Sequence, residues 1–372
     1  MFIIEKKSID VLINVLRKNG YKTIGPTIKE NAIVYDEVES LKDLPEGWTD
    51  EQDDAYYRIK KRNDDAVFGY NVGPYSWKKF LFPPRLKILE LQRDGKKFEV
   101  IEKKEDQTKL AFIGVRACEL NAIIIQDKVF KDGEYKDPNY TNTREKIFVV
   151  AVNCSQAGGT CFCTSMNTGP KVKDGFDISL TEIIKDGEHK FLIETGSEKG
   201  KEVLNKLPFR DADSSEIKDA EKIIKETEKS MGRKLETKGI KELLQNNLEH
   251  PQWDDVAKRC LTCANCTMVC PTCFCSTVED ITDITGEHAE RWRKWDSCFT
   301  IEYAKVAGGN FRTSLKARYR QWMTHKLASW IDQFGTSGCV GCGRCITWCP
   351  AHIDITKEAE AIRNKNTNSP TK

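Results

Sequence analysis

The chain contains the segment Cys260-Leu-Thr-Cys-Ala-Asn-Cys-Thr-Met-Val-Cys-Pro271 and, later, Cys339-Val-Gly-Cys-Gly-Arg-Cys-Ile-Thr-Trp-Cys-Pro350. Both segments have the spacing C-x2-C-x2-C-x3-C-P. Three thiolates at intervals of three residues can surround one cube of iron and sulfide, while the fourth cysteine, which precedes a proline, reaches the neighbouring cube. The repeated spacing therefore predicts two 4Fe-4S clusters that share cysteines crosswise.

Each predicted cluster takes three cysteines from one segment and the last cysteine of the other. The expected ligands are Cys260, Cys263, Cys266 and Cys349 for cluster 1, and Cys339, Cys342, Cys345 and Cys270 for cluster 2. Structural zinc is the plainer alternative, but zinc sites use separated cysteine pairs or mixed cysteine and histidine ligands. The spacing of radical enzymes that cleave S-adenosylmethionine also fits Cys266, Cys270 and Cys273, but no alternating strands and helices follow.

Seven cysteines lie outside these eight positions. Four of them follow strand-like runs or lie in a glycine-rich loop, where a scaffold usually presents ligands, and they predict a third 4Fe-4S cluster: Cys118, Cys154, Cys161 and Cys163. The alternative is a group of reduced thiols around a docking surface or a flavin edge. The other three either pack around the ligands of the first segment or substitute for one of them: Cys273, Cys275 and Cys298.

The composition excludes several functions. With 372 residues the chain is long enough for two or three domains. A net charge of +2 gives no broad field for binding nucleic acid or an anionic membrane. No apolar run approaches the roughly 20 residues that span a bilayer, and the N-terminus has no signal-peptide pattern. We therefore expect a cytoplasmic protein whose fifteen cysteines are not held as disulfides and have another use.

The first part of the chain, residues 1–205, is predicted to be an α/β-type domain. Helices are expected between Ser8 and Gly20 and over 121–130. Apolar runs typical of strands lie at 32–35, 86–91, 110–115, 148–152, 178–180 and 190–194. Residues 206–250 are rich in Lys and Glu, which predicts a charged helical connector.

The last part, residues 251–372, is predicted to be an α-helical dicluster ferredoxin domain, so that the whole chain has an α+β fold. Over 319–334 apolar residues recur every three or four positions, and Lys326 lies off that stripe. A shorter helical pattern is expected through Ala289 and Trp295. Six arginines would offset cluster charge, dock a partner or stay solvated: Arg291, Arg293, Arg312, Arg318, Arg320 and Arg344.

Signatures of an enzyme with its own substrate site are missing. No G-x-G-x-x-G follows a strand, the segment 196–201 is one residue short of a phosphate-binding loop, and the five histidines form no zinc pattern. We therefore expect a chain that makes no bonds in a substrate itself.

Several segments together carry a family resemblance. They are Gly114-Val-Arg-Ala-Cys-Glu-Leu, Val152-Asn-Cys, Gly158-Gly-Thr-Cys-Phe-Cys, Cys260 through Cys275, Trp295-Asp-Ser-Cys-Phe and Gly338 through Pro350. The chain resembles the beta subunit of cytoplasmic sulfhydrogenases from about residue 110 to 355, and the electron-transfer subunit of anaerobic sulfite reductases shares much of the pattern. The resemblance implies a complex with NiFe hydrogenase subunits and a flavin-bearing, NAD(P)-binding reductase subunit.

The cysteine pattern and the resemblance together predict a relay that passes single electrons between these two kinds of subunit, without a nucleic acid or membrane partner. Three alternatives stay open. The chain could serve an anaerobic sulfite reductase, act as a redox sensor or scaffold, or reduce a sulfur compound at a cluster near Cys118 or Cys298. In the last case the isolated chain would turn over with a chemical reductant.

Overall fold

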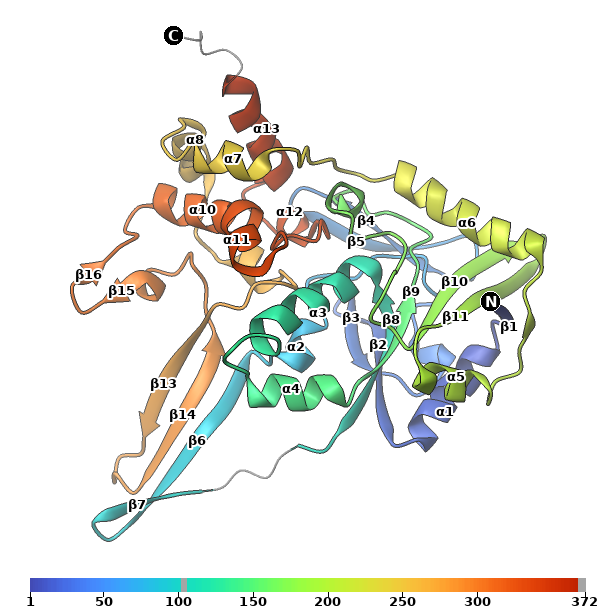
Figure 1. Cartoon of the computed structure of the whole chain (residues 1–372), viewed down its shortest axis with the longest axis horizontal. Coiled ribbons are helices and arrows are strands. Elements are labelled where there is room, and N and C mark those ends of the chain that lie inside the picture. Colours follow the sequence, from blue (N-terminus) through green and yellow to red (C-terminus); the bar gives the residue numbers. More distant parts are fainter. Residues whose placement is uncertain (102–105, 367–372) are drawn as a thin grey trace.

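An eight-stranded mixed sheet lies at the centre of the N-terminal half (Figure 1). The computed structural model describes residues 1–101 and 106–366. The strands of this sheet are β1 (Phe2–Glu5), β2 (Tyr21–Lys29), β3 (Ala32–Glu37), β8 (Lys109–Arg116), β9 (Phe148–Val152), β10 (Ile178–Lys185), β11 (Glu188–Thr195) and β12 (Arg210–Asp211). Their order is β12-β1-β11-β10-β9-β8-β2-β3. The four strands β10, β9, β8 and β2 are parallel to one another, and the strands outside them pair antiparallel.

The parallel centre of the sheet explains its sequence. Every residue of β9 is buried, and β8 is buried from Ala111 onwards. Parallel strands are covered on both faces, so they read as continuous apolar runs. The strands predicted at 32–35, 110–115, 148–152, 178–180 and 190–194 are confirmed here. The strand predicted at 86–91 also forms, but in a different sheet.

Helices cover both faces of the large sheet. They are α1 (Ser8–Lys18), α2 (Lys78–Leu81), α3 (Ala117–Phe130), α4 (Pro138–Glu145), α5 (Glu198–Leu204) and α6 (Ser214–Lys229). Ile4 packs in the main core with α1 and α5, whereas its neighbour Ile3 packs against Ala220 of α6. Successive side chains of a strand point to opposite faces, so α6 lies on the face opposite α1.

A second, four-stranded sheet projects from the body of the molecule, and we call it the arm (Figure 1). It consists of β6 (Arg85–Asp94), β7 (Lys97–Val100), β13 (Ser276–Thr282) and β14 (His288–Trp295), in the order β13-β14-β6-β7. The arm thus joins a hairpin from the first hundred residues to a hairpin that lies between the two cysteine segments.

The helix expected through Ala289 and Trp295 is wrong, because these residues form β14. This strand pairs with β13 on one side and with β6 on the other. The turn between β13 and β14 contains Gly286 in the left-handed region, at φ +70°. One of the two partner strands, β6, lies about two hundred residues away, and the spacing of the apolar residues along the sequence does not reveal it.

The remaining helices form a second core around the cysteine segments. They are α7 (Ile240–Gln245), α8 (Gln252–Arg259), α9 (Asn265–Met268), α10 (Leu315–Thr324), the π-helical η4 (His325–Ser329), α11 (Trp330–Phe334), α12 (Arg344–Thr347) and α13 (Ile355–Asn366). The helix predicted over 319–334 is confirmed. The sequence pattern puts Lys326 outside the apolar stripe of this helix, but its side chain is buried, because the π-helical turn changes which side chains face inward.

The other elements are short. They are the hairpin β4 (Trp48–Asp53) and β5 (Tyr56–Lys61), the hairpin β15 (Lys305–Val306) and β16 (Gly309–Asn310), and the 3-10 turns η1 (Leu41–Asp43), η2 (Cys163–Met166) and η3 (Glu302–Ala304). Among the described residues, no helix combines the length and apolarity needed to cross a bilayer.

Candidate iron-sulfur centres

The four cysteines expected for cluster 1 line one pocket. Cys260 follows the end of α8, Cys263 lies in the loop, Cys266 is in α9, and Cys349 comes from the segment after α12. Three aromatic side chains close the pocket: Phe299, Tyr319 and Trp322. The structure therefore brings together thiols that are more than eighty residues apart, in an apolar setting that would keep water from a bound cluster.

The two cysteine loops have the same backbone conformation. Thr262 and Ala264 have positive φ angles of 51° and 65°, and Gly341 and Gly343 have φ angles of 64° and 74° at the matching positions. In both loops this conformation turns an N–H group towards the first cysteine. Thr262 donates to Cys260 Sγ at 3.4 Å, and Gly341 donates to Cys339 Sγ at 3.4 Å. Such hydrogen bonds stabilise a thiolate that binds iron.

The four cysteines expected for cluster 2 also lie together. Cys270 and Cys339 are buried, and Cys342 and Cys345 are half-buried. Burial raises the pKa of the Cys339 thiol to about 12, against the opposing effect of Lys326, and Cys342 and Cys270 raise it further. Buried neighbouring thiols resist ionisation on their own, whereas a positive iron-sulfide core would deprotonate them outright. The donor set therefore suits a bound cation.

The four N-terminal cysteines converge as well. Cys118 is the second residue of α3, directly after β8, and Cys154 follows β9, so the ends of two adjacent parallel strands present them. Burial raises the pKa of the Cys118 thiol, and Cys163 and Cys342 raise it further. Burial likewise raises the pKa of Cys161 to about 12, with Cys154 and Cys342 among the neighbours that add to the effect. Cys342 of cluster 2 thus borders this set.

The backbone of the N-terminal set packs directly on the cluster 2 loop. The N–H of Phe162 donates to the carbonyl of Gly341 at 2.8 Å. A Cβ atom at Gly341 would lie 2.6 Å from the Phe162 carbonyl, and one at Gly343 would lie 2.3 Å from the Thr160 carbonyl oxygen. Glycine is needed at both positions, because the two chain segments approach closer than any side chain allows.

Two buried arginines lie beside these thiols. Arg116 donates to the carbonyls of Phe68 and Tyr70, and its charge opposes the rise that burial causes in the pKa of the Cys154 thiol. Arg344, at the start of α12, binds Glu119 of α3 at 2.6 Å, and both side chains are buried. Of the six arginines noted in the sequence, Arg344 therefore lies at the clusters. Arg318 is also buried, but it donates to the carbonyls of Phe299, Arg312 and Thr313.

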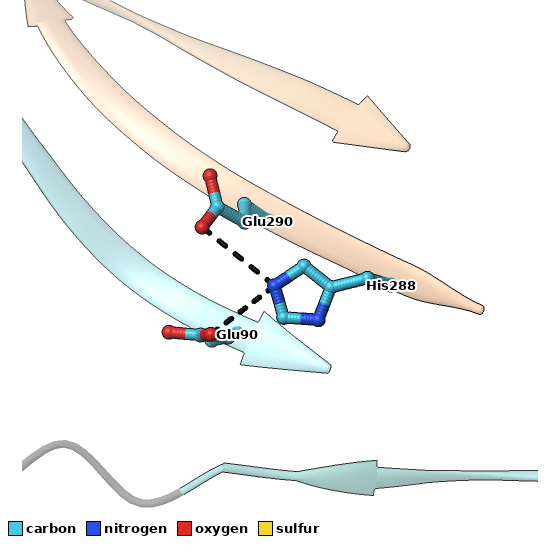
Figure 2. Close-up of side chains that lie close together, drawn as sticks. All are labelled: Glu90, His288 and Glu290. Carbon is cyan, nitrogen blue, oxygen red and sulfur yellow. Dashed lines mark ion pairs between the residues drawn. The ribbon is translucent and has the colours of Figure 1, made fainter. Parts of the chain in front are cut away.

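The thiols are spaced too widely for single metal ions. Tetrahedral zinc, with bonds of about 2.3 Å to sulfur, holds its sulfur ligands about 3.8 Å apart. In the described part of the chain, the only group of three potential ligand atoms within 4.8 Å of one another is Glu90, His288 and Glu290 on the arm, which Figure 2 shows. No three of the fifteen cysteines, all of which the structure describes, are that close, so the thiol sets fit a larger group such as a cluster better than zinc.

The arm group itself is an ion-pair network. His288 Nε2 lies 3.1 Å from Glu90 and 3.8 Å from Glu290 (Figure 2). Lys87 Nζ donates to Glu90 at 2.6 Å and to Glu290 at 2.7 Å, and Trp292 donates to Glu290. Because the Lys87 ammonium bridges both carboxylates and His288 lies between them, their oxygens already have partners without a metal ion.

Two lysines lie beside the cysteines, and the sequence did not identify them as residues of the site. Lys326 Nζ lies 3.3 Å from Cys270 Sγ and 3.5 Å from Cys273 Sγ, and Lys78 Nζ donates to the Cys273 carbonyl at 3.1 Å. Lys78 comes from the short α2, nearly two hundred residues earlier. A lysine within an apolar stretch, such as Lys78 in Trp77-Lys-Lys-Phe-Leu, is a weak signal, and nothing in the sequence links it to the cysteines.

Comparison with known proteins agrees with this geometry. A family model described as a 4Fe-4S dicluster domain matches residues 259–353, which supports iron-sulfur clusters in this part of the chain. The Sulfhydrogenase 2 subunit beta of Pyrococcus furiosus is 33% identical over 328 residues, which cover 87% of this chain and 94% of the relative. The chain belongs to the family of sulfhydrogenase beta subunits, iron-sulfur electron-transfer subunits of hydrogenase-type complexes. No solved structure matches it.

Proposed function

We propose that this chain carries three 4Fe-4S clusters and passes single electrons between NiFe hydrogenase subunits and a flavin- and NAD(P)-binding reductase subunit. The observation that supports this most is the contact of the three thiol sets with one another. Clusters 1 and 2 would be held by the two late cysteine segments, and the third by Cys118, Cys154, Cys161 and Cys163.

The thiol sets form a continuous series. The N-terminal set borders cluster 2 through Cys342, and Cys161 Sγ lies 4.0 Å from the Cys342 carbonyl oxygen. Cluster 2 borders cluster 1, because Cys345 of the cluster 2 set also lines the pocket that holds the four cysteines of cluster 1. The order N-terminal set, cluster 2, cluster 1 therefore gives an electron path across the molecule.

One end of this path reaches the surface. Of the fifteen cysteines, all within the described residues, only Cys263 is exposed, and its neighbour Leu261 is 64% exposed. A redox partner that docks over this loop would bring its own cofactor close to cluster 1. The family of hydrogenase-type complexes supports a hetero-oligomer, and the flavin and NiFe subunits are the partners that the proposal names.

The chain's own residues hold and tune the clusters rather than react. Bound 4Fe-4S clusters accept and release single electrons at potentials that depend on hydrogen bonds and burial. The N–H groups of Thr262 and Gly341 and the ammonium of Lys326 supply such hydrogen bonds here. The sulfhydrogenase relative favours the hydrogenase context over that of sulfite reductase. The reducing cytoplasm would keep these cysteines as thiols that are free to bind iron.

The relay is tested at cluster 1. In the assembled complex, Cys263→Ala should lower hydrogen-dependent NAD(P) reduction about tenfold or more, because it removes an iron ligand. Hydrogen-dependent reduction of an artificial dye should persist, since that reaction needs only the hydrogenase subunits. Lys258→Ala, an exposed change on α8, is the matched control and should alter neither activity. Unchanged NAD(P)-linked activity in Cys263→Ala would refute the relay.

The third cluster has its own test. The double variant Cys161→Ala/Cys163→Ala of the full chain, purified without air, should contain about four fewer irons and sulfides than the parent chain. Thr164→Ala in the same segment should keep the parent iron content. If the folded double variant retained all its iron, the four N-terminal cysteines would be reduced thiols and the proposal would shrink to two clusters.

A further inference from the structure

Three cysteines remain outside the three sets, and two of them repeat a local pattern. Thr160-Cys161-Phe162-Cys163 and Thr272-Cys273-Phe274-Cys275 have the same sequence. Both threonines are fully buried. Phe162 is buried in the second core, and Phe274 makes edge contacts with Phe130, Trp330 and Phe334. In an extended chain, residues two apart point to the same side, so anchoring the phenylalanine presents both thiols together.

The foot of the arm, where β13 begins and β14 ends, brings Cys298 to this pair. The first residue of β13, Ser276, pairs with the last residue of β14, Trp295. Just beyond this pair, the N–H of Asp296 donates to the Cys275 carbonyl at 2.9 Å. This register places Cys298 beside Cys275. Cys298 and Tyr303 lie close enough to Cys275 to lower the pKa of its thiol to about 6, against the opposing effect of burial.

Two buried ammonium groups face these sulfurs. Lys78 and Lys326 are each only 3% exposed. Among the described residues neither forms an ion pair with a carboxylate; Lys326 donates to Cys270, Cys273, Thr272 and Gly338. Lys78 lies over the Trp295 ring at 3.8 Å and donates to the Cys273 carbonyl. Buried cations require compensating negative charge, and sulfur ligands are what the site offers.

From these contacts we propose that Cys273, Cys275 and Cys298 bind a further 4Fe-4S cluster through three thiolates, with the Tyr303 hydroxyl beside the iron that has no cysteine ligand. A core of about +2 with three thiolates carries about −1, the sign that the two lysines need. The three sulfurs are too far apart for a single zinc ion, as in the other sets. The inference goes beyond the three-cluster relay and holds whether or not the N-terminal set binds iron.

This site adjoins cluster 2, because Lys326 Nζ bridges the Cys273 and Cys270 sulfurs at 3.5 and 3.3 Å. It also accounts for the remaining cysteines of the chain. A cluster here would give electrons a branch at the foot of the arm. An iron without a cysteine ligand would be open to exchangeable ligands.

The test uses the full chain purified without air. Cys298→Ala should lower the iron and sulfide content by about four of each per chain. Ser276→Ala, at the start of β13, is the matched control and should keep the parent content. Circular dichroism shows whether each variant is folded. A folded Cys298→Ala variant with unchanged iron would overturn the proposal.

A second measurement needs no substitution. The iron-loaded parent chain is treated with an alkylating reagent, and its peptides are analysed by mass spectrometry. Cys273, Cys275 and Cys298 are half-buried, so the iron-free chain is alkylated at alkaline pH, where free thiols ionise and react. We expect all three to be protected while iron is bound and to be alkylated after its removal. Alkylation of Cys275 or Cys298 in the iron-loaded chain would refute ligation, even if the alanine variant failed to fold.

Discussion

Glu119 and Arg344 connect the two halves of the molecule through a single buried ion pair. Glu119 lies in the first turn of α3, and Arg344 begins α12. Their side chains are 2.6 Å apart, and the Tyr35 hydroxyl donates to the other carboxylate oxygen. A buried pair of this kind contributes little net stability over an apolar pair, but removing one partner leaves an uncompensated charge.

Replacing this carboxylate should therefore destabilise the whole molecule. Glu119→Gln keeps the size of the side chain but leaves the Arg344 guanidinium without its counter-ion, which should cost about 3 kcal/mol of unfolding free energy. Denaturant unfolding of the chain under anaerobic conditions measures this loss. Glu51→Gln breaks an exposed pair with Lys60 and should change the stability by less than about 1 kcal/mol. Equal, small effects of the two changes would contradict the assigned role.

At the scale of elements, the two cysteine loops differ in what lies against them. Both use the left-handed conformation at matching positions, with Ala264 in the first loop and Gly343 in the second. Ala264 carries its methyl group without obstruction by another segment. Gly343 cannot, because the Thr160 carbonyl oxygen lies 2.3 Å from where the Cβ atom would be. The difference reflects the N-terminal set that packs on the second loop.

This comparison gives a matched pair of substitutions. Gly343→Ala should push the Thr160–Cys163 segment away from the loop and lower the unfolding free energy by roughly 1–3 kcal/mol. Iron content should fall with it, since two thiols of the N-terminal set move. Ala264→Gly makes the opposite change at the equivalent position and should cost less than about 1 kcal/mol. Anaerobic thermal unfolding and iron analysis check both; a well-tolerated Gly343→Ala would mean that the segments do not pack as described.

The central strands and the helix α10 to α11 could be predicted from the sequence, whereas the arm could not. The central strands were predictable because buried parallel strands are continuous apolar runs, and α10 to α11 because its apolar stripe has helical spacing. The arm was not, since β14 is stabilised by β6, a strand distant in sequence. Trp292, read as part of a helical stripe, instead packs under the Arg85 guanidinium at 4.1 Å across the sheet.

At the scale of the whole molecule, the cysteine spacing predicted which thiols of the two late segments the fold brings together, because three thiols of each set are local and the repeated pattern indicates the fourth. The N-terminal set was harder to predict, since its four cysteines meet only after β8 and β9 pair and a loop returns. Lys78 and Lys326 could not have been foreseen at all. Their burial is favourable only beside sulfur ligands that come from other parts of the chain.

The exposure of Cys263 has a practical consequence for handling the protein. The other cysteines are at least half-buried, but the solvent reaches Cys263, which the proposal makes a ligand of cluster 1. Dissolved oxygen would therefore damage the proposed cluster 1 first and reach the other clusters later. Material prepared in air would lose its brown colour only in part, because the other clusters remain when cluster 1 is lost. Such a chain would look loaded with iron but could no longer exchange electrons with a partner that docks at Cys263.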